Sequence, residues 1–153
     1  TKGYSIRVDA AEVISPNEYA SRYGKDPSAR LGSPCDDNPC VLDLTMTFTN
    51  DGNTDETSGI LGYLWHAVDE TRNFDYQLDQ FILELSHPEL NGSTKFRIAP
   101  NTSYTAHIPF AGQVTGPYFQ GFEDTYYADI TSRSFDLIVS NLPEKRIIHI
   151  TLD

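Results

Sequence analysis

The chain has 153 residues, of which 39% are hydrophobic, 12% aromatic and 22% charged. This length and composition fit one globular domain and exclude a disordered or fibrous chain. The 11 Lys and Arg residues against 22 Asp and Glu residues give a net charge of -11, which repels nucleic-acid phosphates and anionic lipids alike. We therefore expect no nucleic-acid partner, and no apolar run approaches the ~18 residues of a membrane-spanning helix.

The N-terminal segment alternates apolar and polar residues from about position 3 to 14, a period of two that is typical of a half-buried strand. Ser15 then supplies an N-cap, a proline follows at the first helical position, and Glu18 stands three residues after the cap. Gly24 is a residue type at which helices commonly end. The pattern predicts a short helix over about 16–23.

Residues 25–38 are polar and punctuated by Pro and Gly, which predicts a long loop. We interpret residues 15–40 as an insertion that holds the helix and this loop. Cys35 and Cys40 lie close together among prolines, so we predict a disulfide that closes a tight loop. The competing interpretation is a redox or metal pair, but redox dithiols usually have a Cys-x-x-Cys spacing and a zinc site needs two more ligands nearby. A disulfide implies an oxidising compartment.

Strand signals continue through the rest of the chain, and the clearest is 42–48, where Leu, Met and Phe alternate with Asp and Thr. Strand patterns follow at about 60–68, 74–78, 81–85, 96–98, 104–110, 135–139 and 147–152. Many short strands, one short helix and no alternation of strands with helices predict a single antiparallel sandwich or barrel over 1–153.

Three stretches carry a resemblance to a known family. They are Leu44-Thr45-Met46-Thr47-Phe48-Thr49-Asn50-Asp51-Gly52, a strand with Trp65 near Val68-Asp69-Glu70, and Ile98-Ala99-Pro100-Asn101-Thr102-Ser103-Tyr104 running into Ile108-Pro109-Phe110. This order resembles the immunoglobulin-like domains of secreted lipoproteins of Gram-positive bacteria, most of which are domains of unknown function. The likeness covers about 41–110 and 135–152.

The resemblance implies an all-β fold, an immunoglobulin-like antiparallel β-sandwich with a short helix inserted after the first strand. It also implies a lipid anchor upstream of Thr1, no enzyme activity and no shared catalytic residues. We expect no cofactor. The absence of an initiator Met agrees with a removed targeting segment, although the remnant of a tag would look the same. Where the family commonly has Pro-Gly, this chain has Pro100-Asn101, and Asn tolerates the same left-handed conformation.

The acidic turn 51–56 places oxygen-bearing side chains at alternate positions, as calcium loops do. It lacks the distal bidentate Glu, and hairpin turns favour the same residues, so we interpret it as an ordinary turn. The chain has four histidines that are candidate metal ligands: His66, His87, His107 and His149. His107 and His149 alternate with apolar neighbours and are expected to point away from the core, solvated, and nothing in the sequence places them side by side. We therefore predict no metal ligands.

The sequence holds no Gly-x-Ser-x-Gly motif, no Cys beside a base and no phosphate-binding glycine loop. Glu123 and Asp124 are adjacent carboxylates in a polar loop, whereas glycosidases need two on facing walls of a cleft. We therefore expect that the chain is not an enzyme.

The segment 116–127 has the most unusual composition in the chain, because it combines several aromatic residues with Gly and Pro, which disfavour a regular strand. Aromatic faces beside acids and amides stack on sugars or anchor peptides. The competing interpretation is that some rings plug the open end of the sandwich or pack under the Cys loop. The candidate binding residues are Tyr118, Phe119, Phe122, Tyr126 and Tyr127.

The function that we predict is a non-catalytic extracellular interaction module of a lipid-anchored cell-surface protein, which binds a protein or a cell-envelope component. Membrane attachment is expected only through the upstream anchor. Two alternatives stay open: carbohydrate or small-ligand binding through the 116–127 aromatic loop, and an accessory domain of an envelope enzyme.

Overall fold

A computed structural model describes residues 4–26, 37–52, 57–60, 65–69, 71, 74–91, 93, 95–115, 125–140 and 145–153. The helices in this part of the chain are α1 (Pro16–Tyr23), α2 (Gln80–Ser86) and a single 3-10 turn (Pro88–Leu90). The strands are β1 (Tyr4–Ile14), β2 (Val41–Asn50), β3 (Thr57–Ile60), β4 (His66–Asp69), β5 (Phe74–Leu78), β6 (Lys95–Ile98), β7 (Thr102–Ala111), β8 (Gln113–Thr115), β9 (Thr125–Tyr127), β10 (Ser134–Ser140) and β11 (Arg146–Thr151). None of the described helices is long and apolar enough to cross a membrane.

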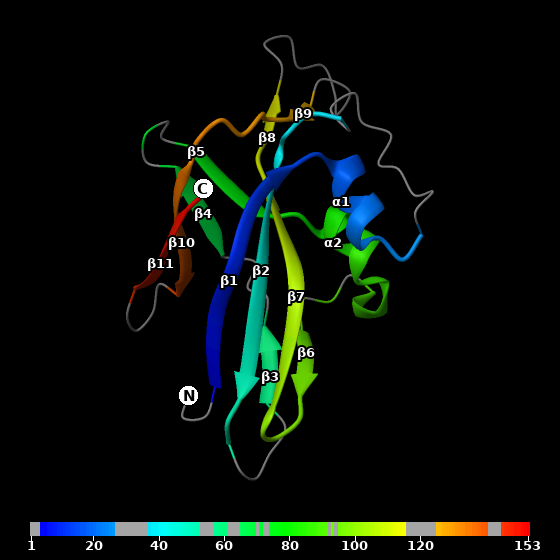
Figure 1. Ribbon diagram of the computed structural model, residues 1–153, viewed down its shortest axis with the longest axis vertical. Coiled ribbons are helices and arrows are strands. Elements are labelled where there is room, and N and C mark those ends of the chain that lie inside the picture. The colour runs from blue at the N-terminus through cyan, green and yellow to red at the C-terminus, as the bar shows by residue number, and fades with distance from the viewer. Residues whose placement is uncertain are drawn as a thin grey trace.

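Seven strands form one sheet in the order β1-β2-β7-β5-β4-β10-β11, and every pairing between its described strands is antiparallel. The two outermost strands, β1 and β11, come into contact, so the sheet is nearly closed (Figure 1). β3 pairs with β6 and β8 pairs with β9 in two smaller sheets. The expected, mainly antiparallel β architecture is confirmed.

The core lies inside the curved sheet and follows the alternation read in β2. From Leu42 to Phe48 the apolar side chains of β2 are fully buried there, while its threonines alternate on the outer face. Trp65 packs parallel to the Phe48 ring, with 6.2 Å between ring centroids. The β2 members of the core are Leu42, Leu44, Met46 and Phe48.

Helix α1 has the predicted bounds and caps. The Ser15 hydroxyl accepts a hydrogen bond from the Glu18 amide at 3.1 Å. At the other end, a Cβ at position 24 would lie 2.2 Å from the Ala20 carbonyl oxygen, so only glycine fits where the helix stops. Asn101 adopts the predicted left-handed conformation, with φ 57.

Both helices pack side by side on the outer face of the β2 and β7 ends (Figure 1). They build a second, smaller core there, so the sheet is buried on both faces at this end. Its buried members are Ile14, Tyr19, Cys40, Val41, Ile82, Ala111 and Tyr127.

Two sequence-based expectations about secondary structure are wrong. The strand expected over 81–85 is helix α2, because the Asp79 side chain accepts from the Ile82 amide at 2.9 Å and caps a helix. Ile82, Leu83 and Ser86 then lie on one buried helical face. The strand expected over 60–68 is divided between β3 and β4, which belong to different sheets.

Several predicted features fall partly or wholly outside the described residues. Cys35 is among them, so the disulfide stays a prediction, and Cys40 is buried in the second core. Most of the acidic turn 51–56 is also outside. Its described beginning is a local turn, because the Asn50 side chain accepts from the Gly52 amide at 3.0 Å.

Candidate functional site

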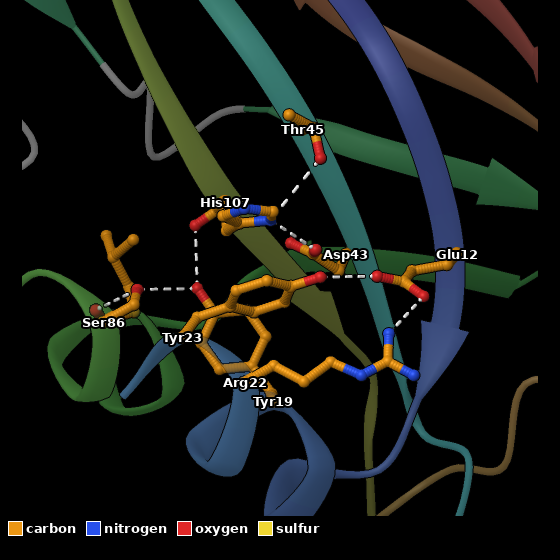
Figure 2. A network of polar contacts seen from close by, with 9 residues as sticks. Glu12, Tyr19, Arg22, Tyr23, Asp43, Thr45, Ser86 and His107 are labelled. Atoms are coloured by element: carbon orange, nitrogen blue, oxygen red, sulfur yellow. Dashed lines mark hydrogen bonds and ion pairs between the residues drawn. The ribbon is translucent and has the colours of Figure 1, made fainter. Parts of the chain in front are cut away.

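A buried carboxylate lies beneath α1 on the outer face of the sheet. Asp43 in β2 is 1% exposed, although its position in the alternating pattern points it away from the main core. Helix α1 covers this part of β2, and its side chains Tyr19, Arg22 and Tyr23 reach across the face (Figure 2). The sequence pattern alone predicts that Asp43 is exposed, whereas in the folded protein helix α1 packs over it and buries it.

His107 of β7 holds this carboxylate in place. Its Nδ1 lies 2.8 Å from Asp43 Oδ2 and 3.4 Å from the Thr45 hydroxyl (Figure 2). The Tyr23 ring stacks on the imidazole, with 3.6 Å between centroids and 14° between planes. The other carboxylate oxygen, Asp43 Oδ1, is buried and has no hydrogen-bond partner among the residues that the structure describes.

The electrostatics of the two neighbouring carboxyl groups differ. Burial raises the pKa of Asp43 to about 6, and the hydrogen bond with His107 only partly opposes this. Burial also acts to raise the pKa of Glu12, which lies beside Asp43 on β1. There the hydrogen bonds from Tyr23 and Arg22, each 2.7 Å long, outweigh burial and hold the pKa of Glu12 below its ordinary value.

A second tyrosine links both helices to β7. The hydroxyl of Tyr19 donates to the His107 carbonyl oxygen at 2.7 Å and is hydrogen-bonded to the Ser86 hydroxyl at 2.7 Å (Figure 2). Burial raises the pKa of Tyr19 well above its ordinary value. This network of hydrogen bonds therefore connects α1, α2 and β7.

A buried carboxylate beside an imidazole can hold or pass a proton. Here the imidazole also carries the Tyr23 ring, and Tyr23 with Arg22 engages Glu12, so the same contacts fasten α1 to the sheet. No group of three or more His, Cys, Asp and Glu side chains that could hold a metal ion occurs within the described ranges. We interpret the cluster as a polar clamp on α1.

The histidine expectations are met in part. His149 is solvated as expected, with 67% of its side chain exposed. His107 points away from the main core as expected and keeps 31% of its side chain exposed, while Tyr23 stacks on its ring. Each histidine lies against a carboxylate; the pairs are His66–Asp75, His87–Glu89, His107–Asp43 and His149–Asp136.

The side chains of Ser134, His149 and Asp136 contact one another in the same order as the side chains of a serine-hydrolase triad. His149 Nε2 lies 3.4 Å from the Ser134 hydroxyl, and its Nδ1 lies 2.7 Å from Asp136 Oδ1. The serine contact is long, and the exposed imidazole is open to competing water. The arrangement follows from β10–β11 pairing, which sets Asp136 opposite His149, and we interpret it as a surface polar cluster.

A cleft of about 380 Å³ lies at the N-terminal end of α2. It is lined by Asp75, Gln77, Leu78, Asp79, Gln80, Phe81, Ala111 and Gly112. Phe81 is 69% exposed, which is unusual for a phenylalanine. The sequence pattern of 81–85 predicts a strand, and so it does not identify Phe81 as part of a site. The signal that would have predicted the helix is Asp79, which is its N-cap.

The cleft adjoins the base of the β8–β9 hairpin. Gly112 in its wall immediately precedes β8, and Tyr127, which ends β9, donates from its hydroxyl to Asp79 Oδ2 at 2.9 Å. The predicted binding segment 116–127 therefore includes β9, the return strand of the β8–β9 hairpin (Figure 1). The base of this hairpin is fixed beside the cleft.

The five predicted binding residues are placed as follows. Tyr118, Phe119 and Phe122 lie outside the described residues, and Tyr126 is placed by its backbone in β9 alone. Tyr127 is 8% exposed and belongs to the second core, in agreement with the competing interpretation that some of these rings pack inside.

The fold defines the structural class of this protein, which is a mainly antiparallel β-domain with two short helices packed on the outer face of its sheet. The chain belongs to the family described as Domain of unknown function (DUF5028), whose model matches residues 1–146. This confirms the expected membership of a domain of unknown function. The comparisons with curated proteins and with solved structures found no match.

Proposed function

We propose that the chain is a non-catalytic extracellular interaction module of a lipid-anchored surface protein of Gram-positive bacteria. In this proposal it binds a protein or cell-envelope partner through the 116–127 segment. The observation that carries the proposal is the hairpin: β8 and β9 pair with each other and stand apart from the seven-stranded sheet. Loops that a rigid scaffold fixes at the base are common recognition elements.

The fixed base is what separates this hairpin from an ordinary connection. The Tyr127 hydroxyl is bonded to Asp79, and the Ala128 amide donates to the Gly112 carbonyl oxygen at 2.8 Å. The Ala128–Gly112 contact holds the two ends of the hairpin together, and the Tyr127–Asp79 contact fastens β9 to the start of α2. A partner that binds 116–124 would therefore meet a loop whose ends are already in position, which lowers the entropic cost of binding.

The proposal includes an immunoglobulin-like sandwich as the underlying fold. Two groups of strands, β1-β2-β7 and β5-β4-β10-β11, support it, because the pairing of β7 with β5 is limited to Ala111 with Gln77 and Phe110 with Leu78. A sheet that is continuous only through so short a corner has two faces that can enclose a core between them.

The experiment measures binding of the fluorescently labelled chain to isolated Gram-positive cell envelopes, with and without prior protease digestion of the envelopes. We expect saturable binding that falls at least about tenfold in a Tyr118→Ala and Phe122→Ala double variant. Ile147→Ala is the control, because Ile147 is an exposed apolar side chain, at 45%, that lies on β11 and outside the 116–127 segment.

Two results would overturn the proposal. One is the absence of saturable binding to any envelope preparation, and the other is equal binding by the double variant and by the Ile147→Ala control. Thermal unfolding of each variant must first show that it folds as the parent chain does, so that lost binding reports on the loop.

A further inference from the structure

The cleft beside α2 has the dimensions and the mixed lining of a small-ligand site. Its volume of about 380 Å³ falls within the ~300–1,000 Å³ of typical ligand pockets. The lining combines two carboxylates, two primary amides and one exposed aromatic ring. Most of the lining residues belong to β5, α2 and the end of β7, and the other two are Asp79, which caps α2, and Gly112, which follows β7, so the cleft is built mainly on regular secondary structure.

Both carboxylates of the cleft are already engaged by neighbouring groups. The carboxylate oxygens of Asp75 lie 2.9 and 2.8 Å from His66 Nδ1. Asp79 accepts from the Ile82 amide and from the Tyr127 hydroxyl, each at 2.9 Å. Neither group offers an unpaired charge to a cationic ligand, while both repel an anionic one.

The two amides of the cleft differ in exposure. Gln77 is exposed on β5, and Gln80 is partly buried at the start of α2. The Gln80 amide nitrogen is buried and has no hydrogen-bond partner among the described residues. Gln77, which is exposed, both donates and accepts through its amide, as a hydroxyl does, so a polyhydroxylated ligand can satisfy both halves of this side chain.

Phe81 supplies the apolar part of the lining. Its ring is 69% exposed, and a ring left bare in water gains free energy when an apolar surface covers it. A sugar ring has one apolar C–H face and hydroxyls around its edge. It therefore matches an aromatic face beside an exposed amide better than a purely apolar or purely charged ligand does.

We propose that this cleft binds a neutral carbohydrate, with Phe81 against the C–H face of a sugar ring and the exposed Gln77 amide hydrogen-bonded to its hydroxyls. The proposal rests on the proposed function and names its ligand class and its second contact surface. It uses described residues alone and is independent of how the 116–124 segment is arranged.

The test is an NMR titration of the isotope-labelled full chain with neutral trisaccharides built from glucose, galactose, mannose or N-acetylglucosamine, each up to ~10 mM, the range needed for weak single-site binding. At least one sugar is expected to shift the amide signals of the cleft residues. Phe81→Ala should weaken this binding about tenfold or more. Phe81→Trp should retain it, and Ile147→Ala should leave it unchanged.

The proposal is overturned if no sugar shifts the cleft signals, or if Phe81→Ala binds as well as the parent chain. It is also overturned if a Lys-rich or Asp-rich peptide shifts these signals and the sugars do not. Such failures leave the proposed function intact when envelope binding still depends on Tyr118 and Phe122. If a sugar binds in the cleft but envelope binding does not depend on Tyr118 and Phe122, the proposal that 116–127 binds the partner is wrong and the proposal of a carbohydrate site in the cleft is kept.

Discussion

Asp43 shows how one buried group makes stability depend on pH. Burial raises its pKa from 3.8 to about 6, so the folded state binds the proton more tightly than the unfolded state does. The stability that this proton supplies is complete below about 3.8 and is lost as the pH rises to about 6. Glu12, Arg22 and His107 are the other charged or titratable groups that act on this carboxyl.

We expect the free energy of unfolding to fall by about 1–3 kcal/mol over this pH interval relative to Asp43→Asn, which cannot titrate. Urea denaturation at several pH values measures this for both proteins. Groups present in both, such as Glu12, cancel in the comparison. Parallel pH profiles for the two proteins would show that Asp43 is not protonated preferentially in the folded state.

Tyr19 allows a second test at the scale of single residues. Its ring is fully buried, and its hydroxyl bonds to the His107 carbonyl oxygen and to Ser86. Tyr19→Phe should lower the free energy of unfolding by about 1–3 kcal/mol, because partners in a dry site lose a hydrogen bond that water cannot replace.

Tyr23→Phe is the matched control for Tyr19→Phe. The Tyr23 hydroxyl also makes a hydrogen bond, to Glu12, but the residue is partly exposed, so water can replace the lost contact. Its cost should stay below about 1 kcal/mol. Equal losses in the two variants, measured by urea denaturation, would contradict the clamp.

At the scale of elements, Asp79 connects a helix start to the hairpin. Its Oδ1 caps α2 through the Ile82 amide, and its Oδ2 accepts from Tyr127 at the base of β8–β9. Ser15 caps α1 through one comparable contact, with Glu18. The two caps therefore differ mainly in the additional bond to the hairpin.

We expect Asp79→Ala to cost about 2–3 kcal/mol and Ser15→Ala about 1 kcal/mol, because the first change removes a cap and a buried side-chain hydrogen bond together. Thermal or urea unfolding measures both. A cost for Asp79→Ala no larger than that for Ser15→Ala would show that the Tyr127 contact contributes nothing to stability.

At the scale of the whole molecule, β2 is the centre of the fold. It pairs along its full length with β1 on one side and with almost all of β7 on the other, and its inward side chains are fully buried. At the Val41 end, α1 covers the outer face of β2 and α2 lies on the neighbouring strand β7. By contrast, β8 and β9 pair only with each other over three residues.

This difference predicts an order of opening. In native-state hydrogen exchange followed by NMR, the amides of β2 and β7 should exchange slowest, through global unfolding, and those of β8 and β9 much faster, through local opening. Equal protection of the hairpin and of β2 would contradict a hairpin that stands apart from the main sheet.

The local parts of this protein are readable in its sequence. Strand β1, helix α1 and strand β2 follow from a period of two, a capping serine with proline and glutamate at the correct positions, and a closing glycine. The left-handed Asn101 is likewise a property of one residue type in one turn. Each signal lies within a few residues, so no distant contact is needed to determine the outcome.

The tertiary structure decided the rest. The apolar residues of 81–85 suit a strand or a helix, and the cap at Asp79 with burial against α1 and β7 selected the helix. Asp43 and His107 are separated by 64 positions, and they meet only because β2 pairs with β7 in one register. That register minimises the free energy of the whole sheet, so local pattern alone cannot reveal which distant side chains it brings together.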